Sequence, residues 1–173
     1  MFDQRPQVLI AEDETIIRLD LRQILEDEGF AVCAEARDGI EAVELARVSA
    51  PDVAIVDLKM PRLDGIEAAR RMYAERPLPI VILTAYGDRP TLERAIGAGV
   101  FAYVTKPFRP ADVVAALLSA LARHDELLAA RREMGRKEEP IEVEVVSPSG
   151  QTWPLRLGRR PDGTIDVSLQ KIK

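Results

Sequence analysis

Five short apolar runs, each followed by a segment with helical periodicity, constrain the fold of this chain more than any other feature. The runs have the length of strands, and apolar residues in the intervening segments recur every three or four positions. Strands that alternate with helices on short connections form a parallel sheet with helices on both faces. The sequence therefore predicts a doubly wound α/β domain. The expected strands are 7–11, 31–36, 53–57, 79–83 and 101–104.

The third run, residues 53–56, ends abruptly in Asp57, and a turn containing Pro61 follows. A continuous apolar run rich in β-branched residues is typical of a strand buried on both faces. Asp57 is therefore expected at the carboxyl edge of the sheet, where ligands bind in open α/β folds. Taken alone, Asp57 could equally well cap the segment that follows it.

The segments between the strands have recognisable helix boundaries. Gly29 is expected to end the first helix, and Asp64 is a suitable N-cap for the third. Cys33 lies in an apolar run, so we expect it to fill the core, and a single cysteine excludes an internal disulfide. The expected helices are 16–25, 40–48, 64–73, 89–98 and a long helix from about 110.

Composition narrows the class of protein. A chain of 173 residues accommodates one α/β domain and a short appendage. Its net charge of −5 argues against a globally basic nucleic-acid binder. No apolar run approaches the roughly 18 residues that span a bilayer, and the start lacks the pattern of a secretory leader. We therefore expect a cytoplasmic protein with no membrane partner.

Polar residues stand at the carboxyl ends of the expected strands. Carboxylates gathered at one edge repel one another unless a cation lies among them, and oxygen ligands without histidine or cysteine suit Mg²⁺ or Mn²⁺. A divalent ion beside a carboxylate, a hydroxyl and a lysine is suited to phosphoryl transfer. Asp57 would be the nucleophile and would become an acyl phosphate. These strand-end residues are Glu12, Asp13, Asp57, Thr84 and Lys106.

The same residues, with the turns around them, resemble the receiver domain of two-component response regulators, over residues from about 6 to 125. The resemblance implies a flavodoxin-like (βα)5 sheet of strand order 2-1-3-4-5, and a sensor histidine kinase as the phosphoryl donor. It also implies a phosphoacceptor with only intrinsic autophosphorylation and autodephosphorylation, not an enzyme. The matching residues are Glu12 and Asp13, Asp57, Met60 and Pro61, Asp64 and Gly65, Thr84 and Ala85, Tyr103, and Lys106 and Pro107.

The resemblance also assigns roles around the phosphoryl group. Asp57 would be the phosphoacceptor, and Lys106 would pair with the phosphoryl group. Glu12 and Asp13 would hold Mg²⁺, Asp13 directly and Glu12 through water, while Lys59 would contribute its backbone carbonyl. The peptide bond between Lys106 and Pro107 is a candidate for the cis form.

Four positions are implicated in switching and in the lifetime of the phosphoryl group. Thr84 and Tyr103 resemble the switch pair, in which the hydroxyl moves to the phosphate and the aromatic ring turns inward. Without the neighbouring motif, Tyr103 would read as an ordinary strand-edge aromatic. The side chain of Lys59 and Tyr86 occupy positions that tune the lifetime in such receivers.

Within the family, the runs 11–14, 58–62 and 102–108 are most similar to receivers of ANTAR-type regulators, whose outputs are RNA-binding antiterminators. The helical pattern of an ANTAR output does not follow. The sequence instead predicts a receiver over 1–125, a helical extension over 126–140 and a β-rich tail over 141–173.

The last helix continues past the expected end of a receiver. Val114, Leu121 and Leu128 keep a seven-residue spacing, which fits either a short dimerising helix or a core helix with a solvated end. His124 lies on this helix with no acid or base partner in the sequence pattern, and we expect it on the surface.

The tail has the two-residue period of strands. It predicts a three-stranded antiparallel meander with one apolar face, too small to bury that face alone, which should pack on the receiver, the long helix or a second subunit. Pro154 indicates an edge-like stretch in its strand. The apolar positions are Ile141, Val143, Val145, Trp153, Leu155, Leu157, Ile165, Val167 and Leu169.

Two outputs compete. The first is protein association, including a homodimer through the fourth helix, fifth strand and fifth helix or through the extended last helix. The alternative is nucleic-acid binding by the tail, whose basic residues are offset by four acidic ones, so we favour association. The basic residues are Arg156, Arg159, Arg160, Lys171 and Lys173.

Overall fold

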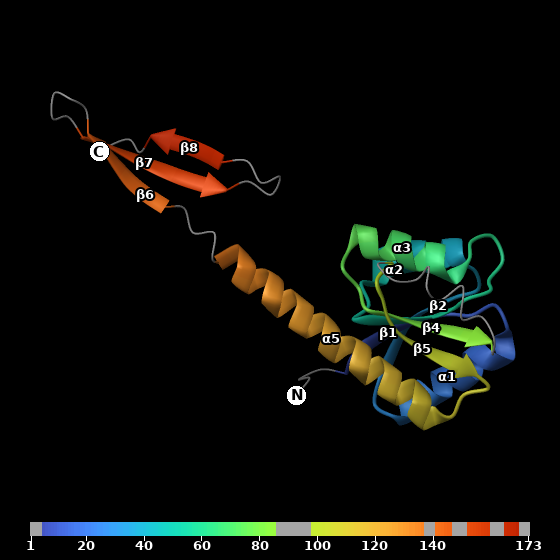
Figure 1. Ribbon diagram of the computed structural model, residues 1–173. Coiled ribbons are helices and arrows are strands. Elements are labelled where there is room, and N and C mark those ends of the chain that lie inside the picture. Colours follow the sequence, from blue (N-terminus) through green and yellow to red (C-terminus); the bar gives the residue numbers. More distant parts are fainter. Residues whose placement is uncertain (1–4, 86–97, 137–140, 147–151, 160–164, 170–173) are drawn as a thin grey trace. The chain divides into compact units, whose positions relative to one another are not determined.

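A computed structural model describes residues 5–85, 98–136, 141–146, 152–159 and 165–169 (Figure 1). The chain divides into two compact units, Met1–Asp125 and Glu126–Lys173. The first unit contains a parallel five-stranded sheet of order β2-β1-β3-β4-β5, which confirms the predicted fold. Its strands are β1 Gln7–Ala11, β2 Ala31–Ala36, β3 Val53–Asp57, β4 Ile80–Ala85 and β5 Val100–Lys106.

Helices cover both faces of this sheet, as Figure 1 shows. Most of the predicted helix 89–98 lies outside the described residues. Helix α5 begins in the first unit and ends in the second, and no helix within the described ranges is long and apolar enough to cross a membrane. The helices are α1 Thr15–Asp27, α2 Gly39–Ser49, α3 Gly65–Glu75 and α5 Pro110–Arg136.

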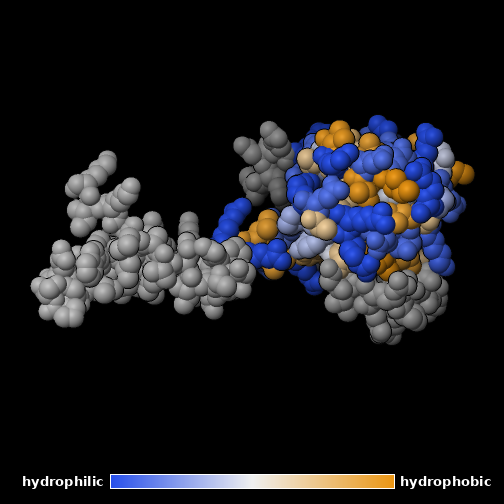
Figure 2. Space-filling view, turned by 90° about the horizontal axis from the view of Figure 1, so that it is seen from above, coloured by the Kyte–Doolittle hydropathy of each residue, from blue (hydrophilic) through white to orange (hydrophobic). Residues whose placement is uncertain are grey.

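Alternation along the strands divides the core into two layers. Leu9 of β1 belongs to the cluster under α2 and α3, whereas Ile10 belongs to the cluster that packs against α1 and the start of α5. Every residue of β3 is buried, as predicted for a central strand. On the side of α2 and α3, the outer surface is largely hydrophilic with smaller apolar areas between (Figure 2).

Capping residues fix where the helices begin and end. The Asp64 carboxylate accepts the N–H of Glu67 at 2.9 Å, which confirms the predicted cap of α3. Asp38 caps α2 by accepting the N–H groups of Ile40 and Glu41, both at 2.9 Å. Gly29, at a φ of 86°, follows α1 in the left-handed region that glycine favours.

Our expectation that His124 lies on the surface is wrong. The residue is 7% exposed, and its ring stands edge-on to Phe101 of β5 with centroids 5.6 Å apart. It shares a face of α5 with Leu117 and Leu121, so position on the helix overrides the usual preference of histidine for water. Cys33 is half-buried on the edge strand β2, and its thiol donates to the carbonyl oxygen of Val8 at 3.4 Å.

The second unit contains the predicted antiparallel meander, β6 Ile141–Val146, β7 Thr152–Arg159 and β8 Ile165–Leu169. The register pairs apolar positions with one another across all three strands, as in Val143, Leu155 and Leu169. Pro154 lies in the central strand and pairs with Glu144, while the described pairing of β7 with β8 reaches only to Leu155. Within the described register, Pro154 therefore pairs with β6 but not with β8.

Candidate phosphoacceptor site

Three strand ends converge to form the site. Glu12 directly follows β1, Asp57 is the last residue of β3, and Lys106 is the last residue of β5. The strands are parallel, so all three residues lie at the same edge of the sheet. The apolar residues that precede them lock this arrangement because they are buried on both sides of the sheet.

Glu12, Asp13 and Asp57 form a compact acidic cluster. One carboxylate oxygen from each lies within 4.8 Å of those of the other two. Glu12 is fully buried, Asp57 is 6% exposed, and Asp13 faces solvent. A cluster that is buried on one side and open on the other can exchange an ion or a ligand with water.

Lys106 joins the two buried carboxylates. Its ammonium nitrogen lies 2.7 Å from Glu12 Oε2 and 2.9 Å from Asp57 Oδ1. Three carboxylates and one ammonium leave two surplus negative charges, which one divalent cation would balance. Because all the donors are oxygens, the residues present fit Mg²⁺.

Burial controls the proton affinities here. It raises the pKa of Glu12, and the nearby Asp57 carboxylate adds to that effect while Lys106 opposes it. It also raises the pKa of Asp57, again against the pull of Lys106 and with a contribution from Asp13. Burial lowers the pKa of Lys106, but its bonds to the two carboxylates outweigh this and leave it raised, so the ammonium stays charged at neutral pH.

The turn after Asp57 is held by backbone contacts. The N–H of Leu58 donates to the carbonyl of Leu83 at 2.8 Å, and that of Gly65 donates to the carbonyl of Leu58 at 2.9 Å. A Cβ at Gly65 would clash with the Asp57 carbonyl oxygen, so the close approach of α3 requires glycine. The backbone N–H of Lys59 donates to the Asp57 carboxylate, while the rest of Lys59 is exposed.

The predicted switch residues lie on neighbouring strands. Thr84, near the end of β4, is 3% exposed, and its hydroxyl donates to the carbonyl of Ala85 at 3.1 Å. Tyr103 of β5 is 61% exposed, so its ring is turned to solvent. Tyr86 lies outside the described residues. The peptide bond between Lys106 and Pro107 is cis, as expected.

One residue that contacts the site was not predicted from the sequence. Arg18 is 8% exposed and donates to the carbonyl oxygens of Glu12 and Asp13 at 2.7 and 3.4 Å. The signal was present, because Arg18 stands three and seven positions before Leu21 and Leu25, on the buried stripe of α1.

Residues 8–118 match the family model described as the response regulator receiver domain. The chain belongs to the response regulator receiver family. Among its relatives, the Transcriptional regulatory protein PdtaR of Mycobacterium tuberculosis is 47% identical over 137 residues, which are 79% of this chain and 67% of PdtaR. The Chemotaxis protein CheY of Halobacterium salinarum is 37% identical over 116 residues, 66% of this chain and 96% of CheY.

A solved structure gives the same result for the fold. The signal receiver domain of a modulated diguanylate cyclase from Desulfovibrio desulfuricans matches with a TM-score of 0.66 and 34% identity, over 70% of this chain and 98% of that domain. The receiver fold thus accounts for most of the first unit, and the family prediction made from the strand-end residues is confirmed.

Proposed function

We propose that Asp57 of this receiver accepts a phosphoryl group with the help of Mg²⁺ and that the modification controls association of the chain. The observation that carries the proposal is the buried Asp57 carboxylate within 4.8 Å of two further carboxylates and 2.9 Å from the Lys106 ammonium. Such a site combines a nucleophile, ligands for a cation and a positive charge for phosphoryl oxygens.

Each residue has a distinct part in the transfer. An Asp57 carboxylate oxygen attacks the phosphorus of a phosphohistidine, the P–N bond breaks, and the imidazole nitrogen keeps the electron pair. Asp13 and Asp57, with the Lys59 carbonyl, would hold Mg²⁺ directly and Glu12 through water. When bound there, the ion would shield charge on the phosphoryl oxygens. Lys106 and the Thr84 hydroxyl would then bind those oxygens. The protein itself is a phosphoacceptor and not an enzyme with a separate substrate.

The phosphoryl donor is a sensor histidine kinase in the cytoplasm, and a groove beside Lys106 suits its docking. Ile16 of α1 is 83% exposed and lines this groove with Pro107 and Phe108. Exposed apolar side chains next to a reacting group favour a partner that delivers the phosphoryl group along this path. Ile17 and Asp20 line the same groove.

Radiolabelled acetyl phosphate tests the acceptor. Asp57→Asn should abolish Mg²⁺-dependent labelling, whereas Asp27→Asn, at the exposed end of α1, should retain it. Persistent labelling of the Asp57→Asn variant would contradict the assignment. Asp13→Ala should weaken Mg²⁺ binding in a calorimetric titration, and an unchanged affinity would remove Asp13 from the ligand set.

For the output, we favour homodimerisation. We divide the chain into a receiver over 1–125, a helical extension over 126–140 and a tail over 141–173. Tyr103 of β5 and Leu118 of α5 are exposed apolar residues on adjacent elements, and the switch would act through Thr84 and Tyr103. Beryllofluoride, which stands in for the phosphoryl group, should raise the mass measured by light scattering. Leu118→Glu should suppress this increase. Val48→Glu, at an exposed apolar residue of α2, should not.

A second output is favoured by one comparison. PdtaR is named a transcriptional regulatory protein, so the basic residues of the tail would instead bind nucleic acid. Salt-dependent retardation of RNA or DNA by the phosphorylated chain would support this output, and its absence at low salt would exclude it.

A further inference from the structure

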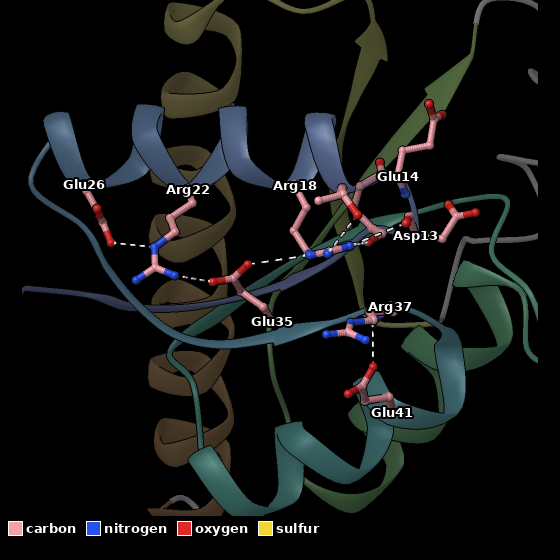
Figure 3. Close-up of polar contacts among 10 residues, drawn as sticks. Asp13, Glu14, Arg18, Arg22, Glu26, Glu35, Arg37 and Glu41 are labelled. Carbon is pink, nitrogen blue, oxygen red and sulfur yellow. Dashed lines mark hydrogen bonds and ion pairs between the residues drawn. The ribbon is translucent and has the colours of Figure 1, made fainter.

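We propose that Arg18 is a positioning residue that holds the backbone of Glu12 and Asp13 in the conformation that binds Mg²⁺. The inference rests on the proposed Mg²⁺ site. It concerns a residue that would contact neither the ion nor the phosphoryl group. Figure 3 shows Arg18 reaching from α1 toward the acidic segment, residues 12–13, and toward β2.

The contacts of Arg18 with the acidic segment are made to backbone oxygens. Its Nη1 donates to the Glu12 carbonyl at 2.7 Å and to the Asp13 carbonyl at 3.4 Å, and Nη2 donates to Thr15 Oγ1 at 3.4 Å. Strand β1 ends at Ala11, so these two carbonyls lie beyond the main part of the strand ladder. A planar guanidinium with fixed donor directions constrains the peptide groups that orient both side chains.

The positive charge of Arg18 is balanced elsewhere. Its Nε lies 3.6 Å from the Glu35 carboxylate on β2, and Arg22 reaches the same carboxylate at 2.6 Å and Glu26 at 3.0 Å (Figure 3). In the described contacts, Arg18 therefore binds the backbone of Glu12 and Asp13 and not their carboxylates. Arg18 thus does not compete with a cation for those carboxylates, and in this it differs from Lys106, whose ammonium pairs with the Glu12 carboxylate directly.

This arrangement predicts a specific defect. Without Arg18 the acidic segment would have more conformations, and the ion would have to order it on binding. Loss of groups that orient metal ligands typically lowers metal affinity by about 10- to 100-fold. Phosphorylation at saturating Mg²⁺ should then recover, because the reacting groups themselves are intact.

The test uses the full chain with Arg18→Gln. Calorimetry should give a dissociation constant for Mg²⁺ raised by about 10-fold or more. Hydrogen exchange of the amides in 12–15, measured without metal, should be faster than in the wild type. Arg22→Gln is the matched control, because Arg22 lies on the same helix and shares Glu35 but makes no described contact with the acidic segment.

The outcomes separate the claims. Absence of Mg²⁺ binding by the wild-type chain would refute the metal site itself. Equal affinity in the wild type and Arg18→Gln, or an equal loss in Arg22→Gln, would refute the role of Arg18. Arg18→Lys covers the case in which Arg18→Gln fails to fold, because it keeps the charge but not the two-directional donor geometry. Wild-type affinity and exchange in that variant would also overturn the proposal.

Discussion

Replacing Lys106 by methionine should strongly destabilise the metal-free receiver. The substitution keeps an unbranched apolar chain but removes the ammonium that pairs with Glu12 at 2.7 Å and Asp57 at 2.9 Å. Glu12 is fully buried and Asp57 nearly so, which means that water compensates only partly for the lost charge.

The distances set the size of the effect. At an effective dielectric constant of about 20, each pair is worth about 6 kcal/mol before desolvation is subtracted. Removing one partner of a buried pair typically costs about 3–5 kcal/mol. Because the Lys106 side chain is 20% exposed, screening by water places the expected loss near the lower limit. A loss of about 3 kcal/mol lowers the folding equilibrium constant by about two orders of magnitude.

Urea unfolding of the metal-free chain, followed by circular dichroism, measures this loss. Arg109→Met is the control, because it breaks an exposed pair with Asp112 in the first turn of α5 and should leave the midpoint unchanged. Added Mg²⁺ should restore part of the stability by binding the folded state. A loss for Lys106→Met no larger than that of the control would refute the claim that the ammonium neutralises a buried acidic pair.

Two further predictions concern Asp57. Burial raises the pKa of the Asp57 carboxyl in the folded chain. Above this raised pKa, ionised Asp57 therefore destabilises the metal-free fold. The penalty disappears as the pH falls through the raised pKa toward the ordinary value of 3.8. Asp57→Asn should therefore be more stable than the wild type at pH 7, with a difference that shrinks on acidification in urea titrations; a pH-independent difference would contradict this. Gly65→Ala should lower stability by about 1–3 kcal/mol and slow phosphorylation, since its methyl group would meet the Asp57 carbonyl, and an unchanged melting temperature would argue against that contact.

Much of the fold could be predicted from the sequence because it depends on local residue patterns. The four residues before Asp57 are all apolar, which is typical of a central strand, and the carboxyl end of a parallel strand lies where the other strands end. Asp64 has the side chain and position of a helix cap, and the structure uses it as one. The meander was predicted for the same reason, because alternation is a local property.

The contacts that were missed depend on three-dimensional packing. The pair between Lys106 and Glu12 joins residues 94 positions apart, and the sequence indicated only that both reach the same edge. Arg18 was not singled out in the sequence, where only its spacing from Leu21 and Leu25 indicates burial. His124 was misplaced because Phe101, which packs against it, comes from another element.

The central claim is that Asp57 captures a phosphoryl group in a Mg²⁺-dependent reaction. The most direct measurement is peptide mapping after treatment with acetyl phosphate, with and without Mg²⁺, followed by borohydride reduction, which converts a phosphorylated aspartate to homoserine. The account predicts conversion at Asp57 alone and only when Mg²⁺ is present. Conversion at a different carboxylate, or equal conversion of Asp57 without Mg²⁺, would contradict it.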